Sequence, residues 1–241
     1  PKNQPPSGRR SVSSFIPDTL LMANPVHIER LIKGGVGEWN KFRRTNQTIQ
    51  PDLSGADLSG YDFTGLDLSH ANLEGADLSD AYLFHANLTE ANLSGVNLTE
   101  ADVQEANLIK ANLSHATMSR IDLSGTGLIA CTLEGANLEG ATLTRASLPW
   151  GNLTRANLAK AKLHLTDLRE AQLVQANLEG ASLQDTSLTG ANLQEANLQG
   201  ATHVSIDLLA KAKTLYLAKL DHALLAQLQS NAPGLFTNPL D

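Results

Sequence analysis

The sequence has a single cysteine, Cys131, among its 241 residues. One cysteine excludes an internal disulfide framework and suits a reducing compartment. No apolar run approaches the length that crosses a bilayer, so we expect no membrane-spanning segment. A secretory pattern is also missing, because Arg9 and Arg10 precede only a broken apolar stretch. These absences favour a cytoplasmic protein, and the thylakoid lumen or periplasm is the alternative if a targeting segment has been removed.

What the sequence has instead is a five-residue repeat that never loses phase. From Leu53 to Leu208 there are 32 consecutive units, and 28 of their central positions are Leu. The exceptions are Phe63, Val103, Met118 and His203. The residue two positions before the centre is Ala in 21 units, and the residue just before the centre is mostly Asp or Asn. So short a period over so long a stretch excludes an ordinary globular fold and predicts a solenoid.

A period of five fits neither an α-helix nor a β-strand. The small residue and the centre are two positions apart, so they share one face of a short extended segment. The next two residues must then turn a corner. The second of them is Gly in 11 units, as expected where a turn needs positive φ. Each unit therefore predicts one side and one corner, and four units close a square coil.

Two units, Ala-Asp-Leu-Ser-Gly at 56–60 and Ala-Asn-Leu-Ser-Gly at 91–95, match the motif A-(D/N)-L-x-x letter for letter. The chain therefore resembles the pentapeptide-repeat family, and its Leu-centred cyanobacterial-type branch in particular. This resemblance implies an all-β solenoid, a right-handed quadrilateral β-helix. The 32 units would make about eight coils and a rod about 38 Å long.

The segments on either side of the repeat predict covers for its open edges, because unpaired edges invite aggregation. We predict four regions. They are a segment 1–24 that is disordered or foreign to the native chain, a helical N-terminal cap over 25–50, the β-helix over 51–210 and a C-terminal helical cap over 211–241. A capped end could instead join two copies, so both a monomer and a homodimer through that end remain open.

The repeat argues against catalysis. His70, His85, His115 and His164 fall in four different columns of a 20-residue stack. No two of them can then lie directly above one another, which excludes a histidine metal site of that kind. No Ser/His/Asp or Cys/His set has a supporting context. We therefore expect no enzymatic activity, no cofactor and no metal.

Two groups of apolar residues break the polar pattern of the outer surface. The first follows the centres at intervals of 20 positions, so its members should lie on consecutive coils about 5 Å apart. Contiguous exposed apolar residues mark contact sites, and a patch without a role is the alternative. The candidate partner-binding residues are Ile109, Ile129, Pro149 and Trp150, hereafter the apolar stripe, together with Tyr82 and Phe84 on a neighbouring side.

Charge is distributed unevenly along the chain. Residues 1–50 have a net charge of +5, residues 51–110 of -10 and residues 111–210 of -3. The basic head has two interpretations: it lies against the acidic first coils, or it meets an acidic partner. The candidate acidic surface consists of Asp57, Asp77, Asp80, Glu100, Asp102, Glu105 and Asp122.

Two functions fit this pattern. The first is a non-catalytic protein-interaction scaffold or regulator that uses its outer faces to bind an unidentified protein, with no membrane and no direct nucleic-acid contact. The second comes from the resemblance, since some family members mimic duplex DNA and modulate DNA gyrase or topoisomerase, as quinolone-resistance proteins do. The acidic coils favour this second function. The basic residues Arg145, Arg155, Lys160 and Lys162 weigh against it.

Overall fold

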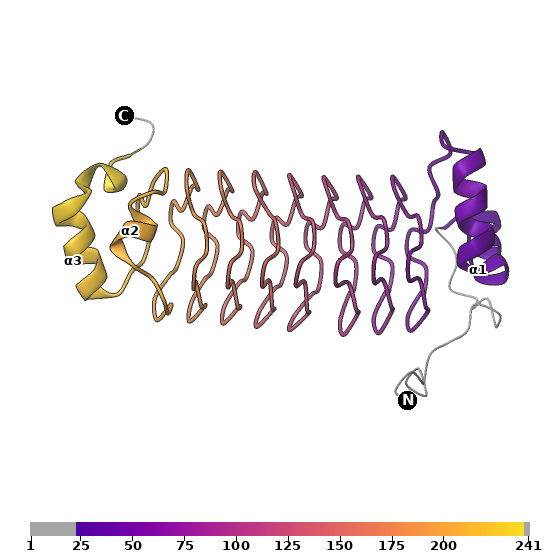
Figure 1. Cartoon of the computed structure of the whole chain (residues 1–241), viewed down its shortest axis with the longest axis horizontal. Helices are drawn as coiled ribbons and strands as arrows, with labels where there is room; N and C mark the ends of the chain where they lie inside the picture. Colours follow the sequence, from indigo (N-terminus) through magenta and orange to yellow (C-terminus); the bar gives the residue numbers. More distant parts are fainter. Residues whose placement is uncertain (1–22, 239–241) are drawn as a thin grey trace.

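The computed structural model describes residues 23–238. The chain forms a straight rod of stacked coils with helices at both ends (Figure 1). The helix α1 (Pro25–Thr45) covers the first coil, and α2 (Ile206–Leu209), α3 (His222–Asn231) and the 3-10 helix η1 (Pro233–Phe236) lie at the other end. Of the predicted segment 1–24, residues 1–22 lie outside the described part of the chain.

Single-residue parallel β-bridges join successive coils. All but the last two link the residue before a centre to the residue 20 positions later, as in the bridge between Asn92 and Asn112. The N–H of the next residue, Leu93, donates to the carbonyl of Asn112 at 2.7 Å. Within residues 23–238 no longer strand forms, because the two corner residues of each unit leave only a short segment to pair. The predicted stacking period of 20 residues is therefore present.

The interior of the rod is filled by the centres and by the small residues beside them. Leu93 and Ala91 are almost fully buried, as are nearly all their equivalents. Where Thr replaces Ala, its hydroxyl finds a carbonyl, as Thr166 Oγ1 does with the Leu143 oxygen at 2.7 Å, so the buried oxygen is satisfied. Cys131 is also buried, and desolvation raises the pKa of its thiol to about 12.

Side chains of α1 replace the hydrogen bonds that a preceding coil would make. The indole N–H of Trp39 donates to the carbonyl of Asp67 at 2.8 Å, and the amide oxygen of Asn40 accepts the Asp67 N–H at 2.8 Å. Arg43, which is 3% exposed, donates to the carbonyl of Ser69 at 2.7 Å. Three groups of one open edge are thus satisfied by one helix, which also prevents another strand from pairing there.

The other end differs from the predicted boundary at 210. The helix α2 occupies the place of the unit centred on Leu208, and it buries Leu209 instead. The last two bridges join residues that are 22 positions apart and not 20: Asn192 with Thr214, and Asn197 with Lys219. The repeat is therefore interrupted by one helical turn and then continues into the region predicted as cap. His203, whose phase predicts a buried centre, is exposed.

The side chain of the residue before the C-terminal helix bonds to the coils and not to the helix. Asp221 is the N-cap residue of α3, yet its side chain makes no hydrogen bond to that helix. Its carboxylate instead accepts the N–H of Gly200 at 3.1 Å. The N–H of Leu215 donates to the carbonyl of Leu235 at 2.7 Å. These contacts fasten the C-terminal segment to the last coils.

Candidate interaction surface

The four sides of the rod are numbered here by their centres. Side 1 has centres at 53, 73 and so on, side 2 at 58 and 78, side 3 at 63 and 83, and side 4 at 68 and 88. Side 4 holds the apolar stripe. The sides run along the axis of the rod in Figure 1, so each is a flat strip in which residues 20 positions apart are neighbours.

Side 1 shows what the repeat does where it is regular. The amide nitrogen of Asn92 donates to Oδ1 of Asn72 at 3.0 Å, and that of Asn112 donates to Oδ1 of Asn92 at 3.2 Å. Oδ1 of Asn92 also accepts the N–H of Ser94 at 3.2 Å, which closes the corner. Side 2 has the same amide ladder through Asn137, Asn157, Asn177 and Asn197. These amide groups already make hydrogen bonds within the chain.

On side 4 the ladder stops at the apolar stripe. Asn107 still accepts the N–H of Ile109 at 3.1 Å, but Gly127 takes the next position and Ser147 the one after it. A Cβ atom added to Gly127 would lie 4.0 Å from Cγ1 of Ile109. Gly127 therefore leaves the flank of Ile109 open. The apolar stripe lies where the polar ladder is missing.

The structure brings three of the four stripe residues to the outer surface. Ile109 and Ile129 are half-buried, and Trp150 is 64% exposed. Pro149, predicted to be exposed, is buried. Its ring closes back on its own backbone and cannot project as an isoleucine does at the same corner position. The outward part of the stripe is therefore Ile109, Ile129 and Trp150.

Trp150 belongs to a column of residues at the second corner position of side 4. Lys110, Ala130, Trp150 and Glu170 all have φ between 54 and 60°. The N–H of Ala130 donates to the carbonyl of Pro149 at 3.0 Å, and that of Trp150 donates to the carbonyl of Arg169 at 2.9 Å. Because their backbones repeat the same conformation on successive coils, their side chains project from the rod in the same direction. These four residues are called the corner column below.

Tyr82 and Phe84 do not join the apolar stripe. They lie on side 3, where Tyr82 bridges to Asp102, and both are half-buried. The ring of Phe84 packs against that of His85, tilted by 49° with 4.0 Å between the centroids. Sequence reasoning missed Leu165 and Leu217, which are 44% and 60% exposed. Both occupy corners with positive φ, and an apolar residue at the second corner position is the signal that could have found them.

The predicted acidic surface divides into two kinds of carboxylate. Asp57, Asp77, Asp102 and Asp122 precede their centres, and each accepts the N–H two residues on, as the asparagines do. All four are half-buried. The other three, Asp80, Glu100 and Glu105, are exposed at corners, and Glu105 lies 3.5 Å from His85. More than half of the predicted acidic surface therefore closes turns.

Several basic residues further along the rod pair with carboxylates. Arg155 lies 3.8 Å from Glu134, and Lys160 lies 3.8 Å from Glu139. On side 4, Arg169 donates twice to Asp167, at 2.8 and 2.7 Å. These hydrogen bonds hold the pKa of the Asp167 carboxyl below its ordinary value of 3.8.

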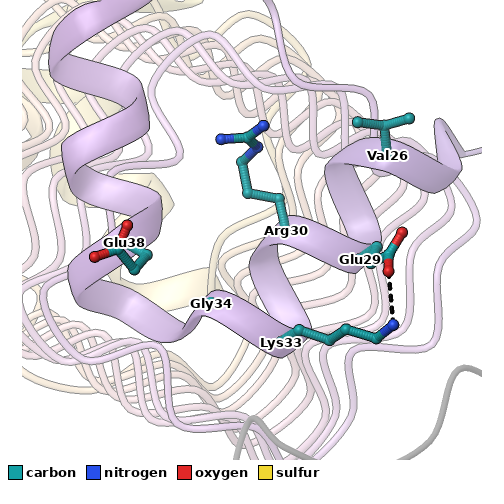
Figure 2. Close-up of a pocket in the computed structure, with 6 residues that line it drawn as sticks. All are labelled: Val26, Glu29, Arg30, Lys33, Gly34 and Glu38. Atoms are coloured by element: carbon teal, nitrogen blue, oxygen red, sulfur yellow. Dashed lines mark hydrogen bonds and ion pairs between the residues drawn. The ribbon is translucent and has the colours of Figure 1, made fainter.

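A cavity of about 360 Å³ lies against α1, lined by Val26, Glu29, Arg30, Lys33, Gly34 and Glu38. Figure 2 shows it between the two arms of the helix, which kinks at Gly35 where φ is 66°. Lys33 pairs with Glu29 at 2.6 Å, and the guanidinium of Arg30 lies 4.3 Å from the ring centroid of Phe42. The charged groups of the cavity are thus partly paired with one another.

Residues 23–238 gather no group of three metal-ligating His, Cys, Asp or Glu side chains. Ser182 Oγ lies 3.2 Å from the His203 ring, but within the described chain no carboxylate pairs with that ring to complete a triad. No helix of the described part is both long and apolar enough to span a bilayer.

The family model for pentapeptide repeats matches eight copies, over residues 49–80, 86–125, 121–159 and 166–202. The chain belongs to the pentapeptide-repeat family. The fold of this family is the right-handed quadrilateral β-helix, and the four-sided stacking described above agrees with it. No curated protein matches the chain.

Solved structures of other family members are similar to the chain. HetL of the cyanobacterium Nostoc sp. strain PCC 7120, a protein involved in heterocyst differentiation regulation, is 28% identical over 75% of this chain and 93% of its own, with a TM-score of 0.34. QnrB1, a plasmid-mediated fluoroquinolone resistance protein, is 20% identical over 74% and 86%, with a TM-score of 0.27. AT2G44920 of the Arabidopsis thaliana thylakoid lumen is 33% identical over 46% and 66%, with a TM-score of 0.24.

Proposed function

We propose that this protein is a non-catalytic scaffold of about eight coils, capped by helices, that binds another protein through side 4. The observation that supports this most directly is the coincidence of the apolar stripe with the gap in the polar ladder. Ile109 and Ile129 lie on consecutive coils beside Gly127, and Trp150 is 64% exposed. Contiguous apolar residues of this kind, with an aromatic side chain among them, are typical of protein contact sites.

The rod suits binding because little in it moves to make a contact. Along the sides of the rod, the surface side chains project from a backbone that hydrogen-bonds to the neighbouring coils. Binding to this rigid surface therefore costs little conformational entropy.

Capture of partners from a native lysate tests this proposal. The variant Ile129→Asp places a charge in the stripe at an outer position, so the fold should remain and the partner should be lost. Thr154→Asp is the matched control, because Thr154 has the same place in its unit on side 1. Equal capture by Ile129→Asp and the unmodified protein would contradict the proposal.

A second candidate function is modulation of DNA gyrase or topoisomerase through DNA mimicry. The supporting observation is that Asp80 and Glu100 are exposed one coil apart at the same corner, and neither has an ion-pair partner within residues 23–238. The ion pairs of Arg155 and Lys160 further along weigh against a continuous negative surface. A supercoiling assay decides, and no effect at micromolar protein would remove this candidate.

A further inference from the structure

We propose that the occupant of side 4 is a second copy of this chain, packed side against side with its axis antiparallel. This inference rests on the proposed function, because it names the partner of the same surface. It comes from the order of residues in the corner column, which reads Lys110, Ala130, Trp150 and Glu170 on successive coils. The column is basic at one end and acidic at the other, with a small and a large side chain between.

A two-fold symmetric contact pairs residue i with residue j and, equally, j with i. When two copies of the column run antiparallel about a point midway between Ala130 and Trp150, Lys110 faces Glu170 of the second copy. In the same arrangement Trp150 faces Ala130 of the second copy, a large side chain opposite a small one. Each contact occurs twice, so charge and size are matched throughout the column.

The column of residues directly after the centres of side 4 is compatible with the same register. Ile129 and the buried Pro149 follow their centres on the two middle coils. The antiparallel arrangement places the outward Ile129 over Pro149 of the second copy, where no side chain projects against it, and places Ile109 opposite Arg169 of the second copy. The gap in the amide ladder also falls at this centre, since Gly127 and Ser147 face one another across the axis. The least polar part of side 4 therefore lies at the middle of the contact, where apolar anchors contribute most.

Other registers are less favourable. A shift of one coil in one direction brings Glu90 against Glu170 of the second copy, which are like charges. The opposite shift stacks Trp150 on its own equivalent and leaves Lys110 facing Gly190. A parallel arrangement places every charge of the column against itself. Like charges across an interface are a strong barrier to a wrong pairing.

The side chains concerned are accessible. Trp150 is 64% exposed, and the side chain of Lys110 is 62% exposed while it pairs with Glu90 at 3.3 Å. Lys110 can therefore bridge Glu90 of its own chain and Glu170 of the second copy. The column covers only about 14 Å of the rod. We expect a weak dimer, with a dissociation constant on the order of 100 µM, because the contact is smaller than the roughly 800 Å² per partner of stable complexes.

Sedimentation velocity of the full chain over a wide concentration range tests the proposal. The unmodified protein should pass from monomer to dimer. Trp150→Glu should weaken the dimer by about 30-fold or more. Lys110→Glu or Glu170→Lys alone should weaken it by about tenfold, because like charges then meet. The double variant should regain the original affinity, because exchanging both charges restores the pairing.

The charge exchange also distinguishes this contact from other ways of forming a dimer. Lys160→Glu is the matched control, because Lys160 occupies the same corner position on side 2, and it should leave the dimer unchanged. Thermal melting should show that all variants remain folded. A dimer that is insensitive to Trp150→Glu and to the single charge reversals uses another surface, such as a capped end, and overturns the proposal.

A protein that stays monomeric up to roughly millimolar concentration also overturns it. In that case the capture experiment with Ile129→Asp separates the two ideas. If capture of a different protein still depends on Ile129, side 4 is an interaction surface with another occupant, and only the dimer is wrong. If capture does not depend on Ile129 either, the proposed function fails as well.

Discussion

Side 1 and side 4 are built from the same repeat, yet they present different chemistry to solvent. On side 1, Asn92 receives and donates hydrogen bonds along the rod and closes its own corner. On side 4, the equivalent position is Gly127, and its neighbours Ile109 and Ile129 are apolar. The residue before each centre therefore serves the fold, whereas the corner positions are free to serve binding.

The largest effect on the free energy of unfolding should come from a substitution in the interior of side 4, and a substitution on its surface should have little effect. Leu128, the centre directly before Ile129, is fully buried. Leu128→Ala should lower the free energy of unfolding by about 2–5 kcal/mol, since it leaves a cavity. Trp150→Ala should change it by only about 0.5 kcal/mol, because the side chain is largely exposed. Urea unfolding measures both, and a larger loss for Trp150→Ala would contradict the division between core and binding surface.

The second largest effect on the free energy of unfolding should come from the amide ladder of side 1. Asn92→Ala removes one donor and one acceptor from a column in which each amide satisfies its neighbours. We expect the free energy of unfolding to fall by about 1–2 kcal/mol. Ser94→Ala is the control, because the hydroxyl of Ser94 makes only a 3.4 Å contact with the Ser114 carbonyl. If both variants unfold at the same urea concentration, the ladder does not stabilise the rod.

Adding an amide at the gap in the ladder of side 4 should stabilise the protein, whereas removing one from side 1 should destabilise it. A Cβ at Gly127 meets no atom closer than 4.0 Å, so Gly127→Asn fits. It should raise the free energy of unfolding by up to about 1 kcal/mol, while its amide crowds Ile109 and weakens self-association. Gly151→Ala is a contrasting control, since its Cβ would lie 3.1 Å from the Leu148 carbonyl. Stabilisation without any loss of association would separate the ladder gap from binding.

The smallest effect concerns pH. The pKa of Asp167 on side 4 is held down by Arg169, so this pair contributes stability above the ordinary value of 3.8 that is lost as the pH falls through the lowered pKa. Asp167→Asn should therefore be less stable than the parent at neutral pH, and the two should converge in acid. Urea midpoints across that range measure it, and parallel curves would contradict it.

The sequence predicted the stacking period because nearly every centre is apolar and is buried whatever its neighbours are. It could not reveal that α2 replaces one side, because Leu208 keeps the phase while Leu209 is the residue that is buried. The roles of Asn40 and Arg43 were also hidden, since their partners lie more than 20 residues away on the open edge.

For the candidate surface, the column of Ile109 and Ile129 was visible from spacing alone. The exposure of Pro149 was wrongly predicted, since position within the corner says nothing of how far a ring projects. The gap at Gly127 could have been seen in the sequence, because it is the one glycine that occupies a ladder position. Its meaning becomes clear only when the amides of sides 1 and 2 are found to be hydrogen-bonded along the rod.

We propose that this protein self-associates through side 4, at the gap in its ladder. Backbone amide NMR shifts followed on dilution test it most directly. We expect concentration-dependent shifts confined to residues 107–110, 127–130, 147–150 and 167–170, with the amides of side 1 unchanged. Shifts at α1 or α3 instead, or none at any concentration, would contradict it.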